Sequence, residues 1–446
     1  MKSFRILYLI FFLSGATGLV YEVIWVRLTG LVFGNTSHAI SVVLGAFMAG
    51  LALGSWWLGR KADHVENPLK FYGVLEIGIG ISAALVPFAF RSLESVYWAL
   101  APSLDNIPAG NGLLRFLTSF AILIVPTFLM GGTLPVLARF FTAAVQEVQR
   151  KVGVLYALNT FGAACGTLAA ALYFVPYLGN TRSTLLIAVV NILIGVSAIL
   201  MSRRAALSGS TEAPVAVFTE SRGSATTDKL VLVSLAMSGF VSMVYEVAWS
   251  RALTAMIGSS TYAFSIMLVT FLVGIALGSS IAVKWRSAGL RLLGMTQLGI
   301  AAGAVVFLVG YLIAPYILLG LLKALSYTFP AVMTSQFLLC ASLMIFPTVC
   351  MGAALPVASQ IYSNKLKVLG RSVGNIYSVN TLGAIAGSLA AGFVLVPLLG
   401  TERTILAGLF VNSAVAALIL SAPGAERRPN LAKWVALGLL VVATLS

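Results

Sequence analysis

Residues 13–55 read LSGATGLVYEVIWVRLTGLVFGNTSHAISVVLGAFMAGLALGS, and residues 237–279 read MSGFVSMVYEVAWSRALTAMIGSSTYAFSIMLVTFLVGIALGS. Eighteen of these 43 aligned positions are identical. A second pair of segments, residues 126–182 and 347–403, agrees at 24 of 57 positions and shares the patterns PTxxMGxxLPV and YxxNTxGAxxGxLAA. The sequence therefore predicts an internal duplication, in which both copies form the same set of elements in the same order.

The composition indicates that these elements are membrane helices. Of the 446 residues 59% are hydrophobic and only 9% are charged, whereas soluble domains carry about 25% charged residues. A helix that crosses a bilayer needs about 20 mostly apolar residues. Two shorter apolar segments, 92–104 and 317–329, are predicted to lie along the outer surface. The runs of spanning length lie near residues 6–32, 36–58, 70–90, 112–137, 152–176, 182–201, 229–257, 260–283, 289–316, 331–358, 371–398 and 402–421, and a further run covers 431–446.

The duplication and the runs together predict the domain organisation. Residues 1–201 and 229–421 each hold six helices, residues 202–228 form a polar linker, and residues 422–446 form a loop and an additional helix. Because six is an even number, both copies cross the membrane in the same sense, as the two halves of major facilitator proteins do. The predicted fold class is all-α integral membrane, with two parallel six-helix bundles and a partial thirteenth helix.

The basic residues follow this topology. The chain carries 28 Lys and Arg against 13 Asp and Glu, a net charge of +15. If the N-terminus is cytoplasmic, 21 of the 28 basic residues fall on the cytoplasmic side, which is the asymmetry that the positive-inside rule describes. They are scattered between apolar runs, so the charge predicts an orientation and no nucleic-acid partner. The lipid bilayer is the first expected partner.

The loop between the second and third runs, GRKADHVENPLK at residues 59–70, resembles the cytoplasmic loop motif of the major facilitator superfamily. Asp63 matches the acid of that motif and Arg60 supplies a basic charge, so both are candidates for an ion pair or a gate. The match is partial, because His64 stands where an arginine is expected and the corresponding loop of the second copy has no acid. Ordinary loop charge on the cytoplasmic side explains the basic residues equally well.

Ionisable side chains at membrane depth are costly and are candidates for function. Glu22 and Glu246 occupy the same position in the two copies of VYEVxWxR, each preceded by a tyrosine, Tyr21 or Tyr245. We predict that the two carboxylates and their tyrosines face one central cavity and contact a solute or protons. The competing interpretation is a structural ion pair within each copy.

The same motif supplies Arg27 and Arg251, which are either partners of the two acids or residues of the outer headgroup level. Trp25 and Trp249 are candidates for solute contact, and they are also candidates for interface anchors. For the two arginines the sequence favours the structural role.

Three further positions carry polar groups inside the apolar runs. Glu76 is a third buried acid, and the matching residue of the second copy is Gln297, which predicts an asymmetric binding site. The matched tyrosines and asparagines of the YxxNTxGAxxG pattern are either solute contacts or contacts between helices. They are Tyr156, Asn159, Tyr377 and Asn380.

The prolines Pro126 and Pro135 recur as Pro347 and Pro356. Proline with glycine inside a span predicts an interrupted helix, and interrupted helices at matching places in two halves point to a transport site. A passive kink that only shapes packing is the alternative. The three cysteines and two histidines lack the spacing of metal ligands, so we expect no metal site, no cofactor and no catalytic residue.

At SGxxGLVYEVIWVRL, followed by GLALGS and LGRKAD, the chain resembles the multi-pass membrane region of bacterial fused proteins that carry a spermidine synthase-like domain. The resemblance covers both copies of the repeat. It implies an aminopropyltransferase domain beyond the last membrane helix or as a separate partner, a bacterial inner-membrane location, and a polyamine as substrate. No Gly-rich nucleotide loop occurs in these 446 residues, so none of the synthase's catalytic acids is carried over and the chain itself is not expected to be the enzyme.

Two functions remain open at this point. The first is alternating-access transport of a small solute, cationic and polyamine-like on the evidence of the buried acids and the resemblance. The second is a membrane anchor or scaffold, without transport, for a spermidine synthase-like aminopropyltransferase. A packed core in which Glu22 and Glu246 pair with Arg27 and Arg251 favours the anchor, and a space between the two copies favours transport.

Overall fold

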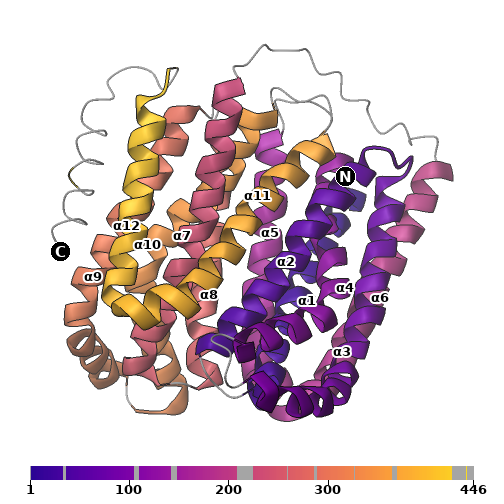
Figure 1. Ribbon diagram of the computed structural model, residues 1–446. Helices are drawn as coiled ribbons and strands as arrows, with labels where there is room; N and C mark the ends of the chain where they lie inside the picture. Colours follow the sequence, from indigo (N-terminus) through magenta and orange to yellow (C-terminus); the bar gives the residue numbers. More distant parts are fainter. Residues whose placement is uncertain are drawn as a thin grey trace.

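The computed structural model describes residues 2–33, 37–104, 110–141, 148–207, 225–258, 260–285, 289–325, 327–363 and 369–423, together with residue 438. Within these ranges the chain is helical and contains no strand, so the predicted all-α class is confirmed (Figure 1). Twelve α-helices follow one another, and each overlaps one of the predicted runs. The linker residues 208–224 and the predicted thirteenth helix at 431–446 lie outside this description, apart from residue 438.

The helices divide into an N-terminal half, α1–α6, and a C-terminal half, α7–α12, which stand beside each other on the right and the left of Figure 1. The first half contains α1 (Lys2–Phe33), α2 (Ser37–Ala62), α3 (Pro68–Leu104), α4 (Gly110–Phe141), α5 (Val148–Ala169) and α6 (Gly179–Leu207). The second contains α7 (Ala225–Ile257), α8 (Thr261–Ala282), α9 (Leu290–Leu325), α10 (Phe329–Ser363), α11 (Leu369–Ala390) and α12 (Val396–Ser421).

A π-helical segment follows α5 and another follows α11, namely η2 (Ala170–Leu178) and η3 (Ala391–Leu395). Shortly after each segment stands a glycine with positive φ: Gly179, at φ 70°, begins α6, and Gly400, at φ 80°, lies at a kink in the first turns of α12. Only glycine adopts this conformation without a steric cost. The pattern VPxLG therefore marks the same turn in both halves.

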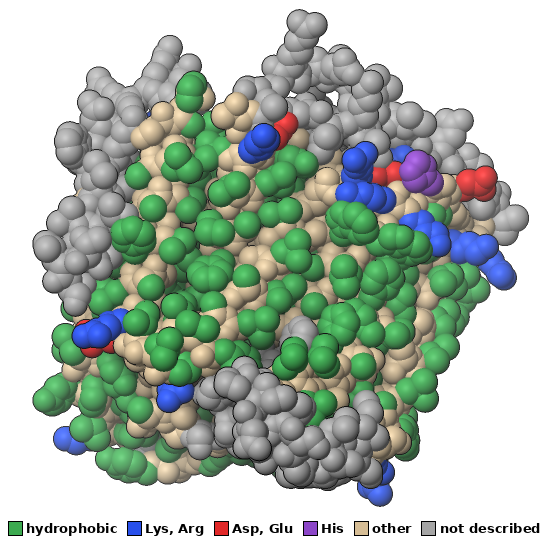
Figure 2. Space-filling view, in the orientation of Figure 1, with side chains coloured by type: hydrophobic (Ala, Val, Ile, Leu, Met, Phe, Trp, Pro, Cys, Tyr) green, Lys and Arg blue, Asp and Glu red, His purple; other side chains and the backbone are tan. Residues whose placement is uncertain are grey.

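Nine described segments are long and apolar enough to cross a membrane, and the two longest, Arg150–Arg203 and Leu369–Ser421, each run through two helices. A space-filling view shows a broad band of hydrophobic side chains, with most of the visible charged side chains near its upper edge (Figure 2). The chain is therefore a multi-pass membrane protein. Lipid contact explains why large side chains such as Leu312, Tyr316 and Leu398 are about three-quarters exposed.

Residues 92–104 continue α3, and residues up to Leu325 continue α9; their place along the outer surface stays a prediction. The prediction that the proline pairs interrupt their helices is wrong, because α4 and α10 are continuous through all four prolines. The passive interpretation of these prolines therefore holds for this conformation.

Glycines beside the prolines serve close helix packing. A Cβ atom added to Gly131 of α4 would collide with the backbone carbonyl of Leu51 on α2, and one added to Gly352 of α10 would collide with that of Ile275 on α8. Small residues that admit a neighbouring backbone are the usual contact surface between membrane helices. The MG pattern of the sequence thus fixes the α2–α4 and α8–α10 contacts.

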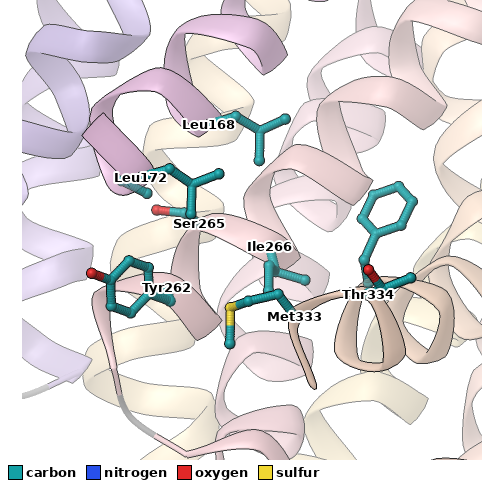
Figure 3. A pocket seen from close by; sticks show the side chains of 9 residues that line it. Leu168, Leu172, Tyr262, Ser265, Ile266, Met333 and Thr334 are labelled. Atoms are coloured by element: carbon teal, nitrogen blue, oxygen red, sulfur yellow. The ribbon is translucent and has the colours of Figure 1, made fainter. Parts of the chain in front are cut away.

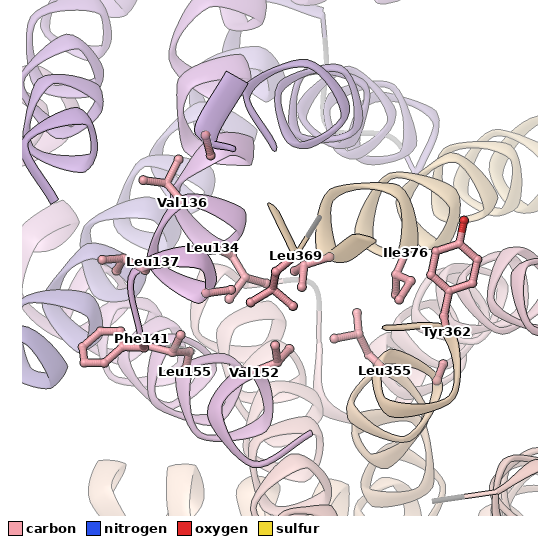
Figure 4. Close-up of a cluster of buried hydrophobic side chains, with 14 of the residues drawn as sticks. Leu134, Val136, Leu137, Phe141, Val152, Leu155, Leu355, Tyr362, Leu369 and Ile376 are labelled. Carbon is pink, nitrogen blue, oxygen red and sulfur yellow. The ribbon is translucent and has the colours of Figure 1, made fainter. Parts of the chain in front are cut away.

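The halves contact each other mainly through two helix pairs, α2 with α11 and α5 with α8, and α5 with α10 and α4 with α11 add smaller contacts. Near one end of the bundle they also share a cluster of buried side chains that point toward one another (Figure 4). We call it the shared cluster; it includes Leu134, Leu137 and Phe141 of α4, Val152 and Leu155 of α5, Leu355 and Tyr362 of α10, and Leu369 and Ile376 of α11.

The other two large clusters are different in kind. The buried members of one come from the C-terminal half alone. Those of the other come from the N-terminal half and Leu268 of α8, with three partly buried side chains of the C-terminal half packed against them, Phe264, Leu272 and Tyr377. The shared cluster is thus the main apolar contact between the halves, and the small cluster of Leu44, Met243 and Ala384 also joins them. At that end α2 reaches Asp63, α4 ends and α11 begins, and we refer to it as the Asp63 end.

Candidate functional site

Glu22 of α1 and Glu246 of α7 lie close enough across the two halves to interact electrostatically. Glu22 is 4% exposed, and Glu246 is half-buried. The described residues provide no hydrogen bond or ion pair to either carboxyl group. Two acids of opposite halves therefore lie within electrostatic range of each other, and no described basic side chain forms an ion pair with either of them.

Two tyrosines surround this pair. Tyr377 of α11 interacts electrostatically with Glu22, and Tyr156 of α5 interacts with Tyr377. Both tyrosines are half-buried. Gly18, one turn before Glu22, faces open space, because a Cβ atom added there would meet no atom within 4 Å. These observations place accessible space beside the acids inside the bundle.

Asn159 and Asn380 are half-buried and lie at matching helix contacts. A Cβ atom added to Gly15 of α1 would collide with the backbone carbonyl of Asn159, and one added to Gly239 of α7 would collide with that of Asn380. α5 thus packs closely on α1, and α11 packs closely on α7. Solute contact by the two asparagine side chains stays a prediction.

Tyr21, Trp25, Tyr245 and Trp249 are fully buried, away from this space. Tyr21 stacks on Trp25 with ring centroids 5.4 Å apart, and Tyr245 stacks on Trp249 at 4.9 Å. Each pair belongs to the apolar cluster of its own half. The interpretation of the tryptophans as headgroup anchors is wrong, and their predicted contact with a solute stays a prediction.

Arg27 and Arg251 are both exposed. Neither forms an ion pair with Glu22 or Glu246 in the described part of the chain. The arrangement that favours a sealed structural core is therefore not the one observed.

Glu76 of α3 lies within the N-terminal half, between α1 and α6, and has no exposed surface. The Ser14 hydroxyl of α1 donates to its Oε1 at 2.5 Å, and the Asn191 amide of α6 donates to its Oε2 at 2.7 Å. The matching residue Gln297 is likewise fully buried within the other half. The asymmetric pair predicted from the sequence thus lies in the two half-bundles, and its contact with a solute stays a prediction.

Asp63 joins the halves at the Asp63 end. Its carboxylate accepts hydrogen bonds from the backbone N–H groups of Gly370 and Arg371, at 2.9 and 2.8 Å, in the first turn of α11. Arg139 of α4 lies 3.7 Å from the same carboxylate. A negative charge at a helix N-terminus is stabilised by the unpaired N–H groups and by the helix dipole. Burial nevertheless raises the pKa of Asp63, against the lowering effects of these hydrogen bonds and of Arg139.

Arg60, the second gate candidate, takes no part in this contact. Its guanidinium lies 4.2 Å above the ring of Trp56 and donates to the Trp56 carbonyl at 2.7 Å, one turn back on α2. The loop motif thus contributes its acid to the contact between the halves, and Arg60 caps its own helix.

Replacing Asp63 by asparagine is expected to weaken closure at the Asp63 end. Asparagine keeps the shape but loses the charge and one acceptor, at a cost of about 1–2 kcal/mol, or roughly fivefold to thirtyfold in the closed population. The measurement is the alkylation rate of a cysteine placed at buried Ser55, which should rise by that factor. Glu66→Gln removes an exposed acid of the same loop and serves as the control; equal rates in both variants would contradict the assignment.

A separate cavity of about 260 Å³ lies between the halves, where α5 and η2 meet α8 and α10 (Figure 3). Leu168, Leu172, Tyr262, Ile266 and Met333 give it a mainly apolar lining. It contains none of the predicted site residues. In the described ranges no group of three His, Cys, Asp or Glu side chains is placed to hold a metal ion.

Sequence reasoning missed the partners of Glu76 and of Asp63. Asn191 offered a signal, because it is an isolated amide in the apolar run LLIAVVNILIGV and recurs as Asn412. The partners of Asp63 offered none, because they are backbone groups separated from it by 307 and 308 residues.

Comparisons with known proteins agree with this picture. No family model matches the chain. It is 27% identical over 195 residues to polyamine aminopropyltransferase 1 of Streptomyces coelicolor, and the aligned segment covers 43% of this chain and 33% of that protein. It is 25% identical over 191 residues to the polyamine aminopropyltransferase of Leptospira interrogans, 42% of this chain and 34% of that protein. The chain thus matches about a third of the length of these curated relatives.

Among solved structures, the human organic anion transporter MFSD10 (TETRAN) superposes with a TM-score of 0.57 and 13% identity, over 93% of this chain and 99% of that one. At this identity the likeness shows the fold alone, and it confirms the major facilitator-like architecture. The chain is therefore a multi-pass membrane protein with that fold, similar in sequence to part of proteins named polyamine aminopropyltransferase.

Proposed function

We propose that the chain transports a small cationic solute of the polyamine type across the membrane by alternating access of its two halves. The observation that carries the proposal is the electrostatic interaction of Glu22 with Glu246 across the halves, without a basic partner in the described residues. Two such carboxylates, one buried and one half-buried, attract positive charge from a solute. A diamine or polyamine brings at least two ammonium groups on one flexible chain, which suits one carboxylate in each half.

The surrounding side chains fit such a solute. Tyr156 and Tyr377 offer aromatic faces and hydroxyls beside the acids, and aromatic faces attract ammonium groups. Asn159 and Asn380 add amides that hydrogen-bond an amine at matching places of the two halves. The relatives named polyamine aminopropyltransferase make the polyamine class the first to test.

The contacts at the Asp63 end fit the alternating-access part of the proposal. The shared cluster and the Asp63 contact with α11 join the halves at this end, while the other two large apolar clusters belong mainly to one half each. We infer that this conformation is closed at the Asp63 end. With the positive-inside orientation, in a bacterial inner membrane, that end is the cytoplasmic one.

The test is uptake of labelled spermidine and putrescine into proteoliposomes that contain the full chain. We expect saturable uptake above that of protein-free liposomes, and competition by unlabelled polyamine. A zwitterionic amino acid and an organic anion serve as control solutes. Background uptake of every amine tested, by protein shown to be folded, would contradict transport.

A second candidate is a membrane anchor for an aminopropyltransferase, which is favoured by the names of the relatives and by the third of their length that this chain matches. It predicts binding to a synthase domain without solute movement. Co-purification with such a domain, together with absent uptake, distinguishes the anchor from the transporter.

A further inference from the structure

The buried carboxyl of Glu76 lies apart from the Glu22–Glu246 pair, inside the N-terminal half. Ser14 and Asn191 bring it two hydrogen-bond donors, both neutral, from α1 and α6. Tyr72, one turn before it on α3, and Tyr21 of α1 are the titratable groups that interact with it. Every described polar group around Glu76 is therefore uncharged at neutral pH.

No described basic side chain reaches this carboxyl. Arg139 of α4 is held against Asp63. The other described basic residues of α1, α3, α4 and α6 are exposed on the surface: Arg5, Arg27, Lys70, Arg91, Arg182 and Arg203. A carboxylate buried without a countercharge is costly, and a carboxyl group avoids that cost by taking up a proton.

The partners of Glu76 suit both protonation states. The side-chain oxygen of Asn191 is buried without a hydrogen-bond partner among the described residues, and the Tyr72 hydroxyl approaches the carboxyl but does not meet hydrogen-bond geometry. A half-turn of the Asn191 amide presents that oxygen to a protonated carboxyl, which then donates to it. Serine, tyrosine and asparagine all donate and accept, so neither state leaves the carboxyl unsatisfied.

The C-terminal half carries the same positions without the acid. Ser238, Gln297 and Asn412 match Ser14, Glu76 and Asn191 in the repeat. Gln297 and Asn412 are fully buried, and in the described part of the chain none of their side-chain polar atoms has a partner. A neutral amide is thus tolerated at this place in the fold, and only the N-terminal half can bind a proton there.

We propose that Glu76, with Ser14 and Asn191, forms a proton-binding site that is separate from the solute carboxylates and confined to the N-terminal half. The step is a protonation alone: a hydronium ion of the solvent gives its proton to the carboxylate and becomes water, and the Asn191 amide reverses its hydrogen bond. Proton binding stands without transport, whereas its coupling to solute movement rests on the function proposed above.

The first test is independent of transport. Infrared difference spectra of the full chain in lipid, recorded between acidic and alkaline pH, should show a carbonyl-stretching band of a protonated carboxylic acid. Glu76→Gln should remove it, and Glu22→Gln/Glu246→Gln should retain it. Gln297→Glu should add a second such band, because it builds the acid into the matching position. Spectra in which Glu76→Gln leaves every carboxylic-acid band unchanged would overturn the proposal.

The second test addresses coupling. In proteoliposomes, an imposed pH gradient should change wild-type spermidine uptake severalfold, and in Glu76→Gln the ratio of uptake with the gradient to uptake without it should fall to about one. Retained pH stimulation in Glu76→Gln would overturn the coupling. If the wild type takes up no amine, the transport function fails, and the infrared result still decides whether Glu76 binds a proton.

Discussion

Uptake of spermidine by the variant Glu22→Gln/Glu246→Gln is expected to fall at least about a hundredfold below that of the wild type. Each charge-assisted hydrogen bond from an ammonium group to a buried carboxylate contributes about 1.5–3 kcal/mol. Loss of both contributions amounts to about 3–6 kcal/mol, and every 1.4 kcal/mol is about tenfold in affinity. The measurement is the initial rate at a polyamine concentration well below saturation.

The single variants sharpen this result. Because the two acids occupy matching positions of the repeat, each single substitution should lower the rate about tenfold or somewhat more. A monoamine engages only one carboxylate. The difference in uptake rate between the double variant and a single variant should therefore be much smaller for a monoamine than for putrescine. Glutamine preserves size and hydrogen bonding, so thermal unfolding should confirm a folded protein.

Glu402→Gln is the matched control, because Glu402 is an exposed acid of the same chain on α12. It should transport at the wild-type rate. If the double variant does so as well, Glu22 and Glu246 have no part in solute binding, and the anchor becomes the better candidate.

The fold was largely predictable because its determinants are local or repeated. Run length identifies each helix, and the VYEVxWxR and PTxxMGxxLPV copies place the same elements in both halves. The errors arose where tertiary packing decides. Pro126 and Pro347 suggested broken helices, yet α4 and α10 continue through them, and the neighbouring Gly131 and Gly352 serve to admit α2 and α8.

The candidate site was predictable only in part. The repeat predicted that Glu22 and Glu246 belong together, because matching residues of parallel repeats lie symmetrically about one axis. Helical periodicity could not say which neighbour faces which helix: Tyr21 is adjacent to Glu22 in sequence but packs into the core of its own half. The partners of Asp63 and Glu76 depend on contacts between distant helices, which no spacing within one helix specifies.

Alternating access makes a second prediction with a large effect, at the contact between α2 and α11. The hydroxyls of Ser55 and Ser378, one from each half, lie 2.7 Å apart. Both serines are buried. They belong to the part of the α2–α11 contact that lies toward the Asp63 end, where Gly59 closely approaches Gly370. A pair of cysteines at these positions brings the two sulfur atoms within reach of a disulfide, whose Cβ atoms lie about 3.5–4.5 Å apart.

In a background in which Cys165, Cys340 and Cys350 are replaced by alanine, oxidation of Ser55→Cys/Ser378→Cys should reduce uptake more than about tenfold, and a reductant should restore it. The physical reason is that the Asp63 end has to open in every cycle, and this opening separates α2 from α11. A disulfide holds the two helices together far more strongly than the hydrogen bond of about 1 kcal/mol that it replaces. Each single-cysteine variant should be indifferent to oxidant. Gel electrophoresis shows which protein is cross-linked. If cross-linked protein retains full uptake, the halves do not separate at the Asp63 end. A solute would then have to cross by a route that keeps α2 and α11 in contact.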